Sequence, residues 1–419
     1  MIVPFHVSEM LRRVRRKIAQ SGEMPRMAPR PDDSRTFRIA PRVTPETVAR
    51  LHRDLGLDAK ARAALFGPGT QEDLPRYARN IENMIGTVAL PVGVIGPLRV
   101  NGVNAQGDYP VPMATSEAAL VASYGRGARA ANRAGGVSTA VLYEGVLRSP
   151  AFVFATLLDA GRFVEWVVAH VEALKSAAEA TTRHGRLVSL EPVIDNNIAF
   201  LLCRYSTGDA SGQNMVTIAT DALCRHIAAE CPIRPAAWYV EGNFSGDKKA
   251  SGLGMITGRG RKVSASVVLP GEVVTRLLGT SIDAMLDYAR VANLGSLLSG
   301  QLGAQAHYAN GLAAIYIATG QDAACVAESA VGFTRMERRE AGLFCSVTMP
   351  SILVGTVGGG TGLPTQSACL ELMGLKGEGH GPALAEVTAA ACLCGEISIV
   401  AAMASGAFSG AHEKLARLR

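Results

Sequence analysis

The chain has 419 residues, of which 48% are hydrophobic and 5% aromatic, with 45 glycines. This composition predicts a compact fold of small aliphatic side chains and argues against disorder, and the length favours two domains or one elaborated domain. The net charge of +6 gathers near the ends, in MLRRVRRKIAQ and EKLARLR. Without interleaved aromatic residues these ends favour solvated helix faces, so neither a nucleic-acid nor a membrane partner is expected.

The eight cysteines form no CxxC pair and have no histidine at zinc spacing. They predict reduced thiols and no metal site. The first 20 residues lack the order of a signal peptide, and the most apolar stretch, 387–408, is interrupted by Glu396. A soluble, cytoplasmic protein is therefore expected.

Residues 1–80 predict an N-terminal helical segment, with helical spacing in MLRRVRRKIAQSG and TPETVARLHRDLGL and a helix start at Thr44 to Glu46. LPVGVIGPLRVNG then predicts short strands between turn formers. TSEAALVASYGRGARAANRAG predicts a helix of small residues, which can approach other backbones closely.

The pattern of apolar and polar residues changes between residues 150 and 240. One amphipathic helix is expected over 163–185, two strands over 186–208, and a loop leading into a helix over 209–231. Helix, two strands and helix together predict a small inserted domain.

Beyond residue 250 the pattern predicts a strand at 263–270, a helix at 271–279 and a long helical run over 281–320. A strand, a glycine loop and a helix follow over 344–374, and the tail predicts one long helix and a short basic one. The expected class is a mixed α/β (α+β) fold in which helix predominates.

The stretch EGNFSGDKKASG places Asp247, Lys248 and Lys249 side by side among glycines. Glycine allows a tight loop that projects these side chains in fixed directions. One lysine could hold a substrate carboxylate while the other stabilises a developing oxyanion, which is worth roughly 3 kcal/mol of barrier. An exposed turn with an ordinary Asp/Lys pair explains the stretch equally well.

Two further regions could meet a phosphate. VGTVGGGTGLPT offers exposed backbone amides, and TTRHGR with GDASGQNM offers Arg183 and a polar loop at a helix start. Neither a GxGxxG pattern nor a Walker A lysine is present, so neither standard nucleotide fold is supported. A glycine-rich turn used only for close helix packing explains VGTVGGGTGLPT equally well, and a purely structural role is favoured for TTRHGR with GDASGQNM.

His412 stands near the end of the chain, in SGAFSGAHEK. A histidine there can be surface decoration, or a proton donor on a segment that moves over a site. The chain has no HExxH and no GxSxG, so metal-dependent hydrolysis and serine acyl transfer have no support.

Seven segments follow one another from about residue 80 to 413: ENMIGTVALPVGVIGPL, VPMATSEAALVAS, GDASGQNM, EGNFSGDKK, AHYANGLAAIYIATGQDAA, MPSILVGTVGGGTGLPTQSACLELMG and GAHEK. In this order they resemble the 3-hydroxy-3-methylglutaryl-coenzyme A (HMG-CoA) reductase family, in the form found in eukaryotes and archaea but without the membrane anchor of the animal enzymes. The resemblance implies a four-electron reduction of HMG-CoA to mevalonate and coenzyme A with two NADPH.

The resemblance also assigns the catalytic residues. It implies that Lys248 stabilises the oxyanion and that Glu117, kept protonated by apolar surroundings, donates a proton. Asp322, expected to be buried near both, holds Lys248 charged. His412 protonates the departing thiolate.

Two sets of binding residues follow from the same resemblance. The substrate contacts are Arg148, Asp247, Lys249 and Asn310, with Lys249 as the carboxylate partner. The cofactor contacts are Thr182, Arg183, Asp209, Ser211, Gly212, Gln213, Asn214, Met215, Gly358, Gly359, Gly360 and Thr361. Arg183 is placed to meet the ribose phosphate, which favours NADPH, with NADH as the alternative.

The family fold implies a large domain with a long central helix (81–149 and 241–419), which binds substrate and coenzyme A. It also implies a small inserted NAD(P)-binding domain (150–240) and a dimer, or a multiple of dimers, with active sites at the subunit interface. Several positions depart from the family pattern. Glu241 replaces a serine that touches the substrate, and the substrate lysine has only Arg290 as a candidate counterpart. Ser211 and Gln213 replace methionines in the polar loop, and Ala411 replaces a serine before the histidine.

Three alternatives stay open on the sequence. The Glu241 substitution suggests a reductase of a related branched acyl-CoA, and the same fold could run oxidatively to degrade mevalonate. A non-enzymatic binding protein on this scaffold is the third, and the presence of all four catalytic residues argues against it.

Overall fold

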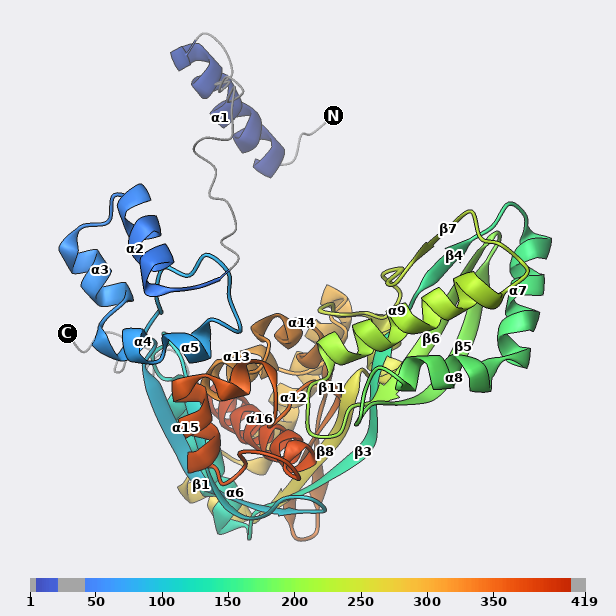
Figure 1. Ribbon diagram of the computed structural model, residues 1–419. Helices are drawn as coiled ribbons and strands as arrows, with labels where there is room; N and C mark the ends of the chain where they lie inside the picture. The colour runs from blue at the N-terminus through green and yellow to red at the C-terminus, as the bar shows by residue number, and fades with distance from the viewer. Residues whose placement is uncertain (1–4, 22–41, 408–419) are drawn as a thin grey trace.

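The computed structural model of the chain describes residues 5–21 and 42–407. Its first helix, α1 (Phe5–Ser21), stands apart from the rest of the molecule in Figure 1. Four short helices follow: α2 (Pro45–Asp54), α3 (Ala59–Leu65), α4 (Pro68–Glu72) and α5 (Leu74–Tyr77). The predicted helix start is confirmed, because the Thr44 hydroxyl accepts a hydrogen bond from the Thr47 backbone at 3.3 Å and caps α2.

An eleven-stranded mixed sheet forms the framework of the molecule. Its central path runs β7-β4-β6-β3-β8-β11-β10-β9, with β1 beside β2 and β3, and β5 beside β6. The strands are β1 (Val92–Gly102), β2 (Gln106–Ala114), β3 (Val137–Arg148), β4 (Ala151–Val153), β5 (Arg186–Asp195), β6 (Ile198–Ser206), β7 (Ala237–Tyr239), β8 (Gly260–Leu269), β9 (Gly303–Ala304), β10 (Gly332–Arg339) and β11 (Gly342–Ile352).

Strand β3 links the two ends of the molecule. Its first part pairs antiparallel with β8, and its last residues, Val146 to Arg148, pair with β6. Strands β4 to β7, together with α7 (Leu157–Ala169), α8 (Val171–Glu179) and α9 (Gln213–Glu230), lie at one end of the molecule in Figure 1. Arg148 therefore stands where this end meets the body.

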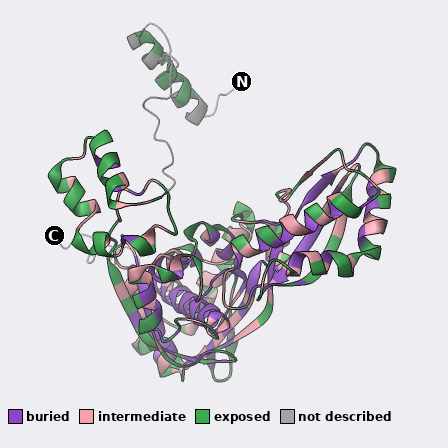
Figure 2. Cartoon of the chain, in the orientation of Figure 1, coloured by how far each residue is buried: buried purple, intermediate pink, exposed green. Residues whose placement is uncertain are grey.

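The remaining helices pack on the body. They are α6 (Leu120–Arg133), α10 (Gly252–Thr257), α11 (Gly271–Arg276), α12 (Ile282–Ser299), α13 (Tyr308–Thr319), α14 (Val326–Ser329), α15 (Pro364–Leu372) and α16 (Gly381–Ala404), with 3-10 turns at Ala323–Cys325 and Gly359–Gly362. Helix α16 packs against α6, β3, β8 and β11, and Figure 2 shows it buried in the interior. At its contact with α6, a Cβ on Gly127 would lie 1.9 Å from the Cys394 carbonyl oxygen, so only glycine fits.

Two buried carboxylates tie α16 to the chain around it. Glu386 accepts hydrogen bonds from the backbone N–H groups of Asn104, Ala105 and Val141 at 2.9 to 3.1 Å. Ten residues further along, Glu396 accepts from the Ala306 and His307 backbones and from the Thr334 hydroxyl at 2.7 to 2.9 Å. A helix that is apolar on all sides has no periodicity to fix its rotation, so these carboxylates set its register.

Two predicted helices are wrong in their extent. The expected helix over 163–185 breaks at His170. The His170 Nδ1 atom lies 2.7 Å from the Trp166 carbonyl oxygen, which would accept from the His170 backbone N–H in a continuous helix. The expected run over 281–320 ends at Gly300, which has φ +72°, and resumes only at Tyr308 after β9.

The apolar stretch near the C-terminus also differs from the expectation. Gly381–Ala404 is long and apolar enough to cross a membrane by length and composition, despite Glu396. In the fold, 83% of its most apolar window is buried, as in the core helix of a globular protein.

Removing the Glu386 carboxylate should destabilise the protein. Glu386→Ala leaves three backbone donors without their acceptor, with the Ala105 N–H fully buried. This loss costs about 3–5 kcal/mol, and a lower thermal unfolding midpoint should follow. Glu378→Ala, on an exposed loop just before α16, is the matched control and should leave the midpoint unchanged. Equal midpoints for the two variants would contradict the role given to Glu386.

Candidate functional site

The EGNFSGDKK loop (241–249) leaves β7 in a strained backbone conformation. Asn243 and Lys248 adopt left-handed φ angles of +62° and +58°, and Gly246 adopts +72°. A side-chain-bearing residue in this region costs about 1–2 kcal/mol, and such strain collects at functional sites. The Lys248 backbone N–H is held by the Glu328 carboxylate at 3.4 Å.

The Lys248 ammonium forms an ion pair with Asp322 at 2.9 Å. The hydrogen bond to Asp322 raises the pKa of Lys248 above its usual value, although partial burial opposes the shift. The expected burial of Asp322 is wrong for this chain, since its side chain is 39% exposed. An exposed pair of this kind adds little to stability, so its main effect is to keep Lys248 charged and oriented.

Beneath the loop, Arg148 holds two carboxylates. Its Nη1 atom lies 3.2 Å from Glu241 and 3.1 Å from Asp247. Three buried polar atoms here have no hydrogen-bond partner within the described part of the chain: Arg148 Nε, Ser149 Oγ and Glu241 Oε1. Glu241, which departs from the family pattern, thus pairs with Arg148, the arginine expected to face the substrate.

A second arginine completes the support. Arg259, 1% exposed, pairs with Asp247 at 3.1 Å and with Glu328 at 2.8 Å, and it donates to the Gln213 side-chain oxygen. Burial acts to raise the pKa of Asp247, but Arg259 and Arg148 outweigh it and lower that pKa. Burial raises the pKa of Glu328 despite Arg259. Lys249 extends outward and donates to the Asp247 carbonyl at 2.9 Å.

Glu117 and Asn310 meet elsewhere on the body. The Asn310 amide donates to Glu117 Oε2 at 2.8 Å, and the Glu117 side chain is exposed, so the expected apolar surroundings are wrong for this chain. Within the described residues, no hydrogen bond or ion pair joins Glu117 to Lys248 or Asp322. The expected catalytic set therefore lies in two groups, Lys248 with Asp322 and Glu117 with Asn310, while His412 lies outside the described residues.

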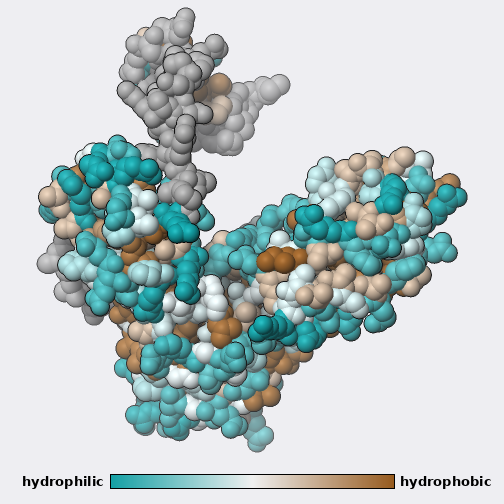
Figure 3. Space-filling model, in the orientation of Figure 1, coloured by the Kyte–Doolittle hydropathy of each residue, from teal (hydrophilic) through white to brown (hydrophobic). Residues whose placement is uncertain are grey.

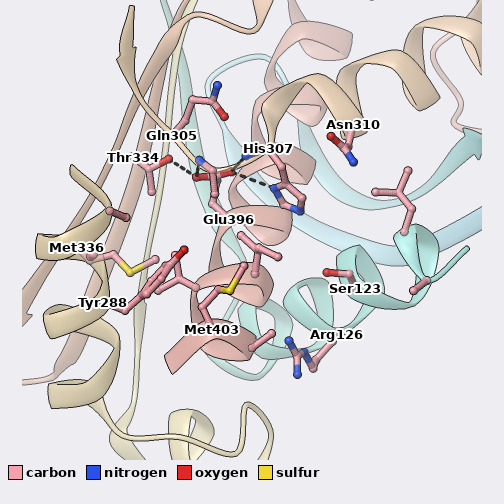
Figure 4. Close-up of a pocket in the computed structure, with 18 of the residues that line it drawn as sticks. Ser123, Arg126, Tyr288, Gln305, His307, Asn310, Thr334, Met336, Glu396 and Met403 are labelled. Atoms are coloured by element: carbon pink, nitrogen blue, oxygen red, sulfur yellow. Dashed lines mark hydrogen bonds and ion pairs between the residues drawn. The ribbon is translucent and has the colours of Figure 1, made fainter. Parts of the chain in front are cut away.

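Glu117 and Asn310 line a cavity of about 680 Å³ between α6, α12, α13 and α16 (Figure 4). His307 projects toward it, with Nδ1 3.1 Å from the buried Glu396 carboxylate. Arg126 and Arg129 also line this cavity. Sequence analysis assigned no role to these three residues, although His307 lies in AHYANGLAAIYIATGQDAA and both arginines lie in TSEAALVASYGRGARAANRAG. Arg290 is exposed on α12 and is not among the cavity residues.

The expected cofactor segments also come together in the fold. Ala210 forms a parallel bridge with Val357, and the Thr356 backbone donates to the Asp209 carbonyl at 2.8 Å, which joins the polar loop 208–215 to the glycine loop 354–362. Thr182 reaches the same place, with its hydroxyl 3.0 Å from Met215 Sδ.

Individual members of these segments differ in role. The Asp209 carboxylate accepts from the Gly379 and Gly381 backbones at 2.7 and 2.9 Å, next to the start of α16. Burial acts to raise the pKa of Asp209, but these two hydrogen bonds oppose it and the pKa is lowered. Gln213 contacts Asp247 and Arg259, so it belongs to the buried charge network. The remaining expected contacts lie in or beside the joined loops. Gly212 stands at the start of α9, and Arg183 and Asn214 are exposed. The others are Ser211, Gly358, Gly359, Gly360 and Thr361.

Among the described residues, no three His, Cys, Asp or Glu side chains are placed to hold a metal ion. The groups expected in the site are two lysines, several carboxylates and glycine-rich backbone.

Comparison with known proteins shows which family this chain resembles. Residues 55–417 match the hydroxymethylglutaryl-coenzyme A reductase family. HMG-CoA reductase from Aeropyrum pernix is 45% identical over 348 residues, covering 81% of this chain and 82% of that protein. The enzyme from Haloferax volcanii is 40% identical over 395 residues, covering 93% of this chain and 97% of that protein.

A solved structure shares the fold at lower identity. The class II enzyme of Streptococcus pneumoniae, bound to NADPH in open conformations, superposes with a TM-score of 0.62 at 19% identity, covering 85% of this chain and 96% of that one. With the archaeal relatives and the family match, this establishes a mixed α/β reductase fold with a large mixed sheet. The chain belongs to the hydroxymethylglutaryl-coenzyme A reductase family and reduces HMG-CoA to mevalonate.

Proposed function

We propose that the reduction of HMG-CoA takes place where Lys248 of one subunit meets Glu117 of another, with NADPH as the reductant. The observation that carries this proposal is the Lys248–Asp322 pair at 2.9 Å on a strained, buttressed loop. A cation held in one orientation stabilises negative charge as it develops on a carbonyl oxygen.

Each reacting group then has one task. When NADPH is bound, it supplies a hydride in each of two reductions. Lys248 stabilises the oxyanion of the mevaldyl hemithioacetal, which then loses coenzyme A as thiolate and leaves mevaldehyde. Lys248 also polarises the aldehyde, and Glu117 provides the proton that completes the primary alcohol. His412, outside the described residues, protonates the thiolate so that it does not add back.

The joined loops fit a nicotinamide dinucleotide. Gly358 and Gly359 have left-handed φ angles and open space where a Cβ would stand, so their backbone can approach a phosphate. Arg183 is exposed beside Thr182, where a guanidinium can pair with a ribose phosphate and select NADPH over NADH. Residues 150–240 would therefore act as the small NAD(P)-binding domain, and 81–149 with 241–419 as the large catalytic one.

The cavity beside Glu117 suits an acyl-CoA. Arg126 and Arg129 supply positive charge for coenzyme A phosphates, while Ile399, Val400 and neighbouring side chains give the cavity an apolar wall. Lys249, Asp247 and Arg148 lie near Lys248, where the hydroxymethylglutaryl group would bind.

A dimer would unite the two groups of catalytic residues. Large apolar side chains are exposed on the segment entering β1, at Val88 and Leu90, and on α12, at Leu294, Leu297 and Leu298. Apolar patches also interrupt the hydrophilic surface in Figure 3. Burial of such patches against a second copy, in a cytoplasmic enzyme, is the assembly we propose.

Replacement of Lys248 tests the catalytic proposal. Lys248→Ala should lower kcat about 10²–10³-fold, because the oxyanion loses its donor, while the thermal unfolding midpoint stays near that of the parent. The loss of NADPH absorbance on addition of HMG-CoA gives the rate. Lys376→Ala, which removes a surface pair with Glu371, is the control and should keep the full rate. Near-normal turnover of Lys248→Ala would contradict the assignment.

Glu241 gives a second test, on substrate affinity. The negatively charged Glu241 side chain pairs with Arg148, beside the expected position of the substrate carboxylate. Glu241→Ser should lower the KM for HMG-CoA roughly three- to tenfold, equivalent to about 1 kcal/mol, with Glu165→Ser on the exposed face of α7 as the control. A higher KM would instead make Glu241 a favourable substrate contact and would support a different acyl preference.

A further inference from the structure

Helix α1 separates apolar and basic side chains onto opposite faces. At 100° per residue, Met10, Leu11, Val14 and Ile18 share one stripe of about 100°. The arginines at 12, 13, 15 and 16 occupy the rest of the circumference and flank the stripe on both sides. The described part of the helix therefore has a narrow apolar face bordered by positive charge.

The apolar stripe is exposed in this fold. Met10 is 53% exposed and Leu11 41%, and Val14 and Ile18 are each more than a third exposed. Figure 1 shows α1 standing away from the body, on the far side of α2 from the sheet. The stripe therefore adds no packing to the catalytic core, and the core does not depend on it.

We propose that α1 binds the surface of an anionic lipid bilayer. In that position the stripe enters the boundary between headgroups and acyl chains, while Arg15 and Arg16 meet lipid phosphates. The basic residues alone would suit a solvated helix face, which is what the sequence favours. The exposed apolar stripe between them changes that interpretation, because a solvated helix gains nothing from it.

Other occupants fit the pattern less well. Nucleic acid would use the arginines but leave the apolar stripe in water. A second copy of α1 would cover the stripe but bring eight arginines close together, which is unfavourable. Only a surface that is both anionic and apolar beneath satisfies both faces.

Co-sedimentation of the full chain with vesicles tests the proposal. Vesicles of phosphatidylcholine with a third phosphatidylglycerol should bind the protein, and pure phosphatidylcholine vesicles should bind it at least tenfold more weakly. Raising the salt concentration should weaken binding to the anionic vesicles.

Two variants separate the contributions of the two faces. Val14→Glu places a charge in the stripe, and Arg15→Gln with Arg16→Gln reduces the positive charge. Each should weaken binding at least tenfold, while NADPH oxidation with HMG-CoA stays at the parental rate. Val168→Glu, at a comparably exposed apolar position on α7, is the matched control and should bind as the parent does.

Three results would overturn the proposal. The first is equal binding by Val14→Glu, which would make the contact purely electrostatic. The second is binding to duplex DNA but not to anionic vesicles. The third is a change in oligomeric state, rather than in lipid binding, when the stripe is altered.

Discussion

Arg148 and Arg259 share the Asp247 carboxylate, and the position of Lys248 depends on this buried contact. Asp247 precedes Lys248 directly, so fixing its side chain between two guanidinium groups fixes the backbone that must adopt a left-handed φ. Breaking a buried pair of this kind costs about 3–5 kcal/mol, more than the strain at Lys248. The contact therefore supports a strained loop that would otherwise relax, and it holds the Lys248 ammonium group where it pairs with Asp322.

The network also joins regions that lie far apart in the chain. Arg148 ends β3, Gln213 starts α9, Arg259 precedes β8 and Glu328 lies in α14. The segments expected to bind cofactor adjoin this network. Gln213 contacts Asp247, and Asp209, four residues earlier, accepts from the backbone at the start of α16. The segments expected to contact substrate and cofactor thus meet at Gln213, while Asp209 ties the polar loop to the start of α16, the helix whose register Glu386 and Glu396 determine.

The sequence predicted the local features well and the long-range ones poorly. The cap at Thr44, strands β5 and β6, and the strand, glycine loop and helix around 344–374 have short-range signals, and the structure confirms them. Strands β2 and β10 were missed because Pro110 and Pro112, or a run of charges at 335–339, hide their alternation. The pairing of Glu241 with Arg148 and the exposure of Asp322 depend on residues distant in sequence, which no local pattern encodes.

The central claim is that one active site uses Lys248 from one subunit and Glu117 from its neighbour. Subunits carrying Lys248→Ala and subunits carrying Glu117→Ala should each be inactive alone, and mixed dimers should regain activity. Random mixing should restore about a quarter of the parental rate, because half of the dimers then carry one intact site in two. If mixed dimers form, as shown by recovery of both variants through a tag on one, and no HMG-CoA-dependent NADPH oxidation returns, the two residues do not act across the interface and the account is wrong.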